Sequence, residues 1–243
     1  MSDDTWPEGV DARDNYILGA LPDQEYRSVF EALEPIQATI TESVFEPEVA
    51  IAHVYFPISS VFSLVAPERK DIAAVEVGTI GREGIVGLPV FLGAGTSPFA
   101  AFCQIAGPAA RIPAPGFRSL LGDAAVLRQQ LERFTHAAMV QLAQNVACNR
   151  VHGAQQRASK SLLMTHDRVG RDRFSLTQDF LAQMLGVARP RASQTASALQ
   201  DAGLIAYSRG VITILDRHGL EARACTCYGL MRAQFDGLRT HGA

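Results

Sequence analysis

The stretch SLTQDFLAQMLGVARPRASQTASALQDAGLIAYSRGVITIL (residues 175–215) has the pattern of two short helices around a tight turn, followed by a β-hairpin. Ser175 and Thr177 can each cap the first helix, and Gln178 lies three residues after Ser175, as in a capping box. Gly186 suits the turn between the helices. This order of elements predicts a winged helix-turn-helix.

The second predicted helix has an outer face that a DNA major groove admits. Pro190 suits its first position, because proline has no N–H to leave unpaired there. The first turn also offers Arg189, Arg191, Ser193 and Gln194, while the apolar side chains stay on the inner side. Arginine pairs with guanine and glutamine with adenine, and arginine and serine contact phosphates. The alternative is an ordinary solvated face of a helical hairpin.

The predicted hairpin strengthens the case for DNA binding. Strand-like runs over 205–207 and 211–215 flank Ser208-Arg209-Gly210, in which the glycine suits a tight turn. An arginine at the tip of such a wing can hold the DNA backbone. The residues expected to contact DNA are Thr177, Gln178, Arg189, Arg191, Ser193, Gln194, Ser197 and Arg209.

The charges are distributed unevenly along the chain, which has 22 Lys and Arg against 25 Asp and Glu. Residues 1–153 contain 10 basic and 18 acidic residues, whereas residues 154–224 contain 10 basic and 6 acidic residues. A basic module on an acidic body is expected when only one end of the molecule meets a polyphosphate.

Length and composition favour two domains with buried cores, since the chain has 243 residues and 47% of them are hydrophobic. There is no run of about 18 apolar residues and the first residues are acidic, so we expect neither a membrane span nor a secretory signal, and a cytoplasmic location. Cys103, Cys148, Cys225 and Cys227 are scattered along the chain. This spacing predicts neither a disulfide framework nor a metal site.

The first half of the chain predicts a helix followed by a β-structure. A helix is expected over 15–34, and short β-type runs broken by glycine and proline extend from Ala38 to Arg111. Their near-regular spacing predicts a small barrel or double sheet, with a tight corner in the glycine-rich segment 78–88. The expected strands cover residues 44–45, 51–56, 61–65, 73–77 and 99–105.

A long helix is predicted over 117–152, with a hinge at 149–153, and its apolar residues form two stripes. One stripe advances by alternating four- and three-residue steps, which is typical of a helix that pairs with another helix, so we expect it to form a dimer interface. The second stripe is expected to rest on the barrel, and burial of both within one chain is the alternative. The dimer stripe is Leu127, Leu131, Phe134, Ala138, Gln141 and Asn145; the second is Val126, Met139, Leu142, Ala143 and Val146.

An opening helix, a β-roll, a long dimerisation helix and a winged helix-turn-helix resemble the Crp/Fnr family of bacterial transcription regulators. The resemblance covers nearly the whole chain and is most specific at HVYFPISSVFSLV (53–65), GREGIVGLPVFLGAG (81–95), FLAQMLGV (180–187) and GLIAYSRGVITILDRHGL (203–220). It implies an α+β fold with a helix and β-roll over 1–116, a dimerisation helix and hinge over 117–153, and a DNA-binding domain over 154–243. It also implies a homodimer that binds inverted-repeat double-stranded DNA and contacts RNA polymerase.

The positions that bind cyclic nucleotides in this family differ here. Leu88 follows Gly87 where those members have a glutamate for the ribose, and residues 95–99 contain no arginine for the phosphate. Burying a phosphate without a guanidinium group is costly, so cyclic AMP is not the expected effector. The N-terminal cysteine cluster of the iron–sulfur members is also missing. No cofactor is predicted, and another small molecule would bind near Gly87, Leu88, Ser97 and Phe99.

The predicted recognition helix departs from the family as well. Its members often present a glutamate and an arginine in the first turn, where this chain has Pro190 and Gln194. Proline cannot hydrogen-bond to a base and glutamine favours adenine. We therefore expect an altered DNA half-site, with Gln194 setting part of the preference.

An enzyme built on a β-roll is the main alternative function. A metal-dependent enzyme of this kind needs two or three histidines and a carboxylate, but His53 is the only histidine before the long helix. No P-loop, Gly-x-Ser-x-Gly or dinucleotide-binding motif occurs. We therefore expect no enzymatic activity. A C-terminal domain that binds protein instead of DNA is the second alternative.

Overall fold

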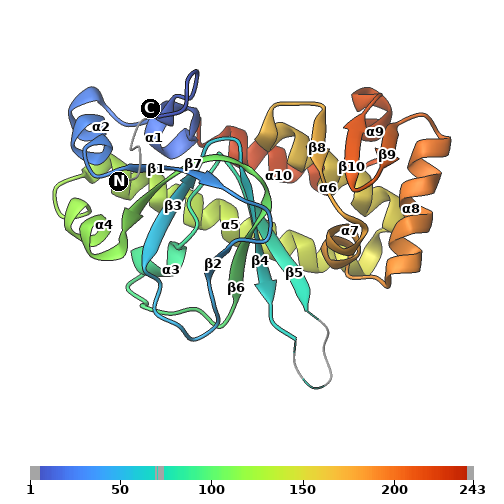
Figure 1. Ribbon diagram of the computed structural model, residues 1–243, viewed down its shortest axis with the longest axis horizontal. Coiled ribbons are helices and arrows are strands. Elements are labelled where there is room, and N and C mark those ends of the chain that lie inside the picture. The colour runs from blue at the N-terminus through green and yellow to red at the C-terminus, as the bar shows by residue number, and fades with distance from the viewer. Residues whose placement is uncertain (1–5, 69, 71–73, 240–243) are drawn as a thin grey trace.

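The computed structural model describes residues 6–68, 70 and 74–239, and it has an α+β fold with a β-roll and a C-terminal winged helix-turn-helix (Figure 1). The predicted fold class is confirmed. In Figure 1 the roll and the N-terminal helices occupy the left of the molecule, and the helix-turn-helix occupies the right. None of the described helices is long and apolar enough to cross a membrane.

The β-roll consists of two antiparallel sheets, with strand orders β1-β7-β3 and β2-β6-β4-β5. Its strands are β1 (Glu34–Ala38), β2 (Ser43–Phe45), β3 (His53–Pro57), β4 (Val61–Ala66), β5 (Val75–Ile80), β6 (Ala100–Ile105) and β7 (Gly107–Pro113). The strands expected near residues 44, 53, 63 and 102 are present as β2, β3, β4 and β6. The strand expected over 73–77 is β5, which begins at Val75; residue 73 lies outside the described residues. β1 and β7 were missed, because their prolines interrupt the strand pattern.

The N-terminal helix predicted over 15–34 is divided. A short 3-10 helix (η1, Ala12–Asp14) precedes α1 (Tyr16–Gly19) and α2 (Asp23–Phe30). Pro22 has an extended backbone and stands at the N-cap of α2, so one helix cannot continue through it. Asn15 caps α1 through Oδ1, and its fully buried amide donates to the carbonyls of Pro57 and Gly84. These bonds attach the segment to the roll.

The long helix begins later than predicted. A four-residue helix, α3 (Leu88–Phe91), and α4 (Ala114–Leu120) precede α5 (Ala125–Val151), and a turn at 121–124 separates α4 from α5. Ala124 at the N-cap of α5 has no side-chain acceptor. Instead, the Glu25 carboxylate accepts hydrogen bonds from the backbone N–H groups of Val126 and Leu127 at 3.1 Å. A carboxylate at this position also favours the positive end of the helix dipole.

The C-terminal region is the predicted winged helix-turn-helix. Its helices are α6 (Ala154–Val169), α7 (Gln178–Leu185), α8 (Arg189–Asp201), α9 (Arg217–Arg223) and α10 (Cys227–Asp236), and its strands are β8 (Arg173–Ser175), β9 (Ile205–Ser208) and β10 (Val211–Ile214). The sheet order is β8-β10-β9, so β8 adds a third strand to the predicted hairpin.

Two local predictions in this region need correction. Thr177 alone caps α7, accepting from the N–H of Phe180 at 3.2 Å, whereas Ser175 lies in β8, so the predicted capping box is wrong. Pro190 is the second residue of α8, because the helix begins at Arg189. Gly186 takes the left-handed conformation, φ 58°, that turns the chain from α7 to α8.

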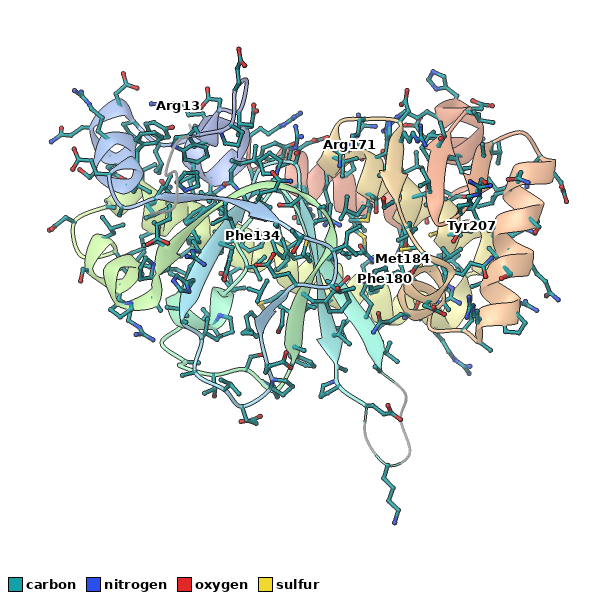
Figure 2. The ribbon with its side chains drawn as sticks, in the orientation of Figure 1. Arg13, Phe134, Arg171, Phe180, Met184 and Tyr207 are labelled. Atoms are coloured by element: carbon teal, nitrogen blue, oxygen red, sulfur yellow. The ribbon has the colours of Figure 1, made fainter. Side chains whose placement is uncertain are left out.

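The helix-turn-helix packs against the β-roll. Phe180 of α7 stacks on Phe102 of β6 with a centroid distance of 5.4 Å, and Phe180 and Met184 lie on the side of α7 that faces the roll (Figure 2). In addition, Arg168 of α6 forms a buried ion pair with Glu83, with 2.6 Å between Nη2 and Oε1. A ring stack and a buried ion pair therefore join the two parts.

Candidate nucleic-acid interface

The two sides of α8 differ sharply in burial. Ala192, Thr195, Ala196 and Leu199 are buried against the rest of the domain. The outward side is polar, and α8 forms the right-hand edge of the molecule, away from the roll (Figure 1). Arg189, Arg191, Gln194 and Ser197 are exposed on it. This is the small, polar outer surface that a helix needs to enter a major groove.

The first turn of α8 concentrates positive charge. Arg189 pairs at 3.4 Å with Asp179, but both side chains are largely exposed, so the pair leaves the guanidinium group available to another acceptor. Arg191 and Gln194 line a hollow of about 430 Å³ together with the N-terminal residues of α6. A helix N-terminus presents free N–H groups that attract phosphate. The start of α6 is thus a candidate phosphate contact that the sequence analysis missed.

The wing forms a tight turn. Arg209 (φ 49°) and Gly210 (φ 74°) both take the left-handed conformation between β9 and β10, as in a type I′ turn. Arg209 is exposed at this tip. The Gly210 carbonyl accepts from the N–H of Leu176 at 2.8 Å, so the wing lies beside the start of α7.

The eight predicted DNA-contacting residues lie at the start of α7, along α8 and at the tip of the wing. Six are exposed, whereas Gln178 and Ser193 are half-buried. Thr177 uses its hydroxyl oxygen to cap α7, although that hydroxyl can still donate to a phosphate. DNA contact by these residues stays a prediction.

The prediction that the first stripe of α5 forms the dimer interface is wrong, because these side chains face the interior of the protomer. Leu127, Leu131 and Phe134 are at most 1% exposed. Gln141 donates to the Thr79 carbonyl, and Asn145 donates to the Val77 carbonyl and accepts from Lys160. Ala138 is half-buried against the same core. The six residues Leu127, Leu131, Phe134, Ala138, Gln141 and Asn145 therefore attach α5 to its own chain.

Most of the stripe expected to rest on the roll is exposed, although Val126 at its start packs against the core as predicted. Met139, Leu142 and Val146 are 65%, 38% and 73% exposed. Helical periodicity defined two stripes but not which one met the roll. A Cβ atom at Gly84 would overlap the Phe134 ring, so the glycine permits the close approach that selects the inner stripe.

The residues suggested for an effector pocket do not gather around one cavity. Gly87 caps α3, Leu88 begins that helix, and Ser97 is buried and accepts from the N–H of Phe99. Phe99 lines a cavity of about 310 Å³ between β4, β5, α5 and the C-terminal domain. Glu76 in its wall accepts from Ser63 and Gln104, and desolvation raises the pKa of Glu76 to about 7.

Three of the four cysteines meet at the end of α5. Ligand atoms of Cys148, His152, Cys225 and Cys227 all lie within 4.8 Å of one another. Hydrogen bonding to Cys225 lowers the pKa of the Cys148 thiol to about 4, and nearby Lys160 contributes in the same direction. This group contradicts the interpretation that the cysteines are scattered. In the sequence, only the short spacing of Cys225 and Cys227 pointed to this group.

Comparisons with known proteins agree with this arrangement. Residues 156–223 match the family described as the Crp-like helix-turn-helix domain. FixK2 from Bradyrhizobium japonicum has a similar structure, with a TM-score of 0.67, 14% identity, and coverage of 80% of this chain and 98% of that one. No curated protein matches the sequence.

Two further solved structures show the same fold. A putative regulator of the Crp/Fnr family from Eubacterium rectale has a TM-score of 0.63 and 15% identity, covering 86% of this chain and 98% of its own. A putative cAMP-binding regulatory protein from Silicibacter pomeroyi has a TM-score of 0.61 and 21% identity, covering 88% of this chain and 96% of its own. The similarity therefore extends over the roll as well as the helix-turn-helix.

Proposed function

We propose that the chain is a DNA-binding transcription regulator of the Crp/Fnr type that acts as a homodimer on an inverted-repeat DNA site. The match of residues 156–223 to the Crp-like helix-turn-helix domain and the fold shared with solved regulators of this type support the proposal. The observation that carries this proposal is the outer face of α8, where Arg189, Arg191 and Gln194 are exposed while the opposite side is buried. Arg209 on the wing is exposed as well and is available to the DNA backbone.

The exposed stripe of α5 supports the dimer. Met139, Leu142 and Val146 follow each other at steps of three and four residues, which is the spacing of a helix that pairs with a second helix. If two protomers pair through this stripe, a two-fold axis relates them and each protomer presents one copy of α8. Two DNA half-sites one helical turn apart have the same two-fold symmetry. Contact with RNA polymerase, proposed from the family, would follow DNA binding in the cytoplasm.

Cyclic AMP is not the effector in this proposal. A cyclic phosphate needs a guanidinium group or an equivalent cradle, and residues 95–99 contain no arginine. Leu88 also offers no carboxylate to a ribose. Any other effector could control DNA binding only if it bound more tightly to one arrangement of the β-roll and the helix-turn-helix than to another.

Selection of duplexes from a random pool by the ligand-free protein tests the proposed function. Enrichment of an inverted repeat, with binding that weakens steeply as salt increases, would support it. No enriched sequence, or binding to a protein partner that duplex DNA does not compete away, would favour the alternative of a protein-interaction module. Enrichment of the usual family half-site would contradict the altered preference expected from Gln194.

Gln194→Ala is expected to relax base preference at one position of each half-site, at a cost of about 1–3 kcal/mol per lost bidentate contact. The exposed amide on α8 is the group that would pair with adenine. Affinity measured against a panel of single-base variants of the selected site checks this. Gln129→Ala, an exposed glutamine near the start of α5, should leave the panel unchanged.

Arg209→Asn is expected to weaken binding to all sequences about equally and to reduce the log–log salt slope by about 1 for each half-site. Asparagine tolerates the positive φ of 49° at this position, so the variant removes the charge and keeps the turn. Titrations at several salt concentrations measure the slope. Arg118→Asn removes an exposed arginine of α4 and serves as the control. An equal loss of DNA affinity in this variant would show that Arg209 does not contact the DNA backbone.

Val146→Glu is expected to convert the dimer to a monomer, because it places a charge at the most exposed residue of the stripe Met139, Leu142 and Val146. Loss of the paired half-site contact should lower specific affinity about 100-fold or more. Sedimentation and DNA titration measure the two effects. Gln129→Glu adds the same charge to α5 outside the stripe, and a variant at Val146 that stays dimeric would contradict the proposed interface.

A further inference from the structure

Four potential metal ligands converge where α5 ends. Cys148 lies in the last turn of α5 and His152 follows that helix directly, four residues later. Cys225 and Cys227 lie in and just after the connection between α9 and α10. The Sγ atoms of Cys148 and Cys225 are 3.6 Å apart, and Cys227 Sγ is 3.5 Å from His152 Nδ1.

These distances agree with the edges of one tetrahedron around a single ion. A Zn–S bond of about 2.3 Å gives sulfur–sulfur edges of about 3.8 Å in tetrahedral geometry. The remaining ligand-atom pairs lie within 4.8 Å, so small side-chain rotations would complete the arrangement. Three sulfur ligands and one imidazole nitrogen form a known structural zinc set.

The surroundings also suit a bound ion. The three cysteines are at most 4% exposed, which shields the ligands from water and oxidants. Gln144 donates from Nε2 to Cys227 Sγ at 3.0 Å, the kind of outer hydrogen bond that orients a thiolate ligand. Lys160 lies close enough to act electrostatically on Cys148, so its charge would offset excess negative charge at the site.

We propose that Cys148, His152, Cys225 and Cys227 bind one thiophilic divalent cation, with Zn²⁺ as the occupant that fits the ligand set. On binding, each cysteine thiol that is still protonated releases its proton to solvent, neutral His152 coordinates the ion through Nδ1, and no electron is transferred. Three thiolates and one divalent ion leave a net charge of minus one beside the Lys160 ammonium group.

The position of the site gives the ion a structural role. It lies at the segment between Val151, where α5 ends, and Ala154, where α6 begins. Through the ion, Cys225 and Cys227 would be linked to the segment between α5 and α6. The ion would therefore fix the angle between these two helices. Ion binding goes beyond the proposed function, and its detection requires no DNA.

Titration of the reduced, chelator-treated full-length protein with Co²⁺ tests the site. We expect one equivalent to bind with the visible absorption bands of tetrahedral cobalt thiolate, and Zn²⁺ to displace it. Cys225→Ser and Cys227→Ser should lose these bands. Cys103→Ala, which alters the buried cysteine of β6, should retain them.

Gln144→Ala keeps all four ligands and is expected to weaken Zn²⁺ binding by about 10–100-fold, which covers the case that a cysteine variant fails to fold. The proposal is overturned if the fully reduced protein binds no Co²⁺, or if the Cys225→Ser and Cys227→Ser variants bind it as the wild-type protein does. Iron with inorganic sulfide in the purified protein would overturn it, as would a Cys148–Cys225 disulfide in the purified protein that, once reduced, leaves a protein that takes up no ion.

Discussion

Arg168→Met is expected to lower the free energy of unfolding by about 3–5 kcal/mol, because it leaves the Glu83 carboxylate buried without its counter-charge. The side chains of Arg168 and Glu83 are 4% and 3% exposed. The guanidinium group also donates to the Thr79 hydroxyl and carbonyl and to Gln141 Oε1, so the substitution breaks a network that joins α6, β5 and α5. Urea unfolding measures the loss.

Two further variants make this result specific. Asp236→Ala breaks an exposed pair with Arg232 and should cost no more than about 0.5 kcal/mol. Replacing Glu83 with leucine in the Arg168→Met background should recover part of the loss, since no unpaired charge then remains. If the double variant is less stable than Arg168→Met by more than about 1 kcal/mol, the buried carboxylate is not the cause of the loss.

Phe134→Ala is expected to lower the free energy of unfolding by about 3–5 kcal/mol, because it empties a site that is filled by a ring only 1% exposed. The ring of Phe134 packs directly on Gly84. Thermal or urea unfolding measures the effect. Gln129→Ala on the exposed surface of the same helix should stay within about 0.5 kcal/mol of the original protein.

Gly84→Ala tests whether the loss of stability in Phe134→Ala comes from the packing of the Phe134 ring on Gly84. Alone, it should destabilise the protein by about 1–3 kcal/mol, because the new methyl group meets the Phe134 ring. In the Phe134→Ala background the same methyl group enters the vacated space and should cost little. Additive losses in the double variant would show that the two residues do not compete for one space.

The parts of the fold that sequence reasoning predicted are those with short-range signals. Gly186, Thr177 and the Arg209-Gly210 turn each act within a few residues, so α7, α8 and the hairpin could be placed. The third strand of that sheet was missed, because β8 has only three residues and pairs with β10 about 38 residues later.

The features that were missed depend on long-range contacts. Two apolar stripes on α5 look alike in sequence, and the close approach of Gly84 to Phe134, not periodicity, decides which stripe is inside. Cys148 and Cys225 are 77 residues apart, so only folding reveals that they are neighbours. The eight predicted DNA-contacting residues share one short segment, which is why they could be named together.

The carboxylate of Glu25 completes the first turn of α5 from a position 101 residues earlier in the chain. A fragment that starts at α5 would lack this acceptor, and its first N–H groups would have only water as a partner. The division of the chain at 116 and 117 therefore separates two pieces that depend on each other, and truncation there would fray the longest helix from its beginning.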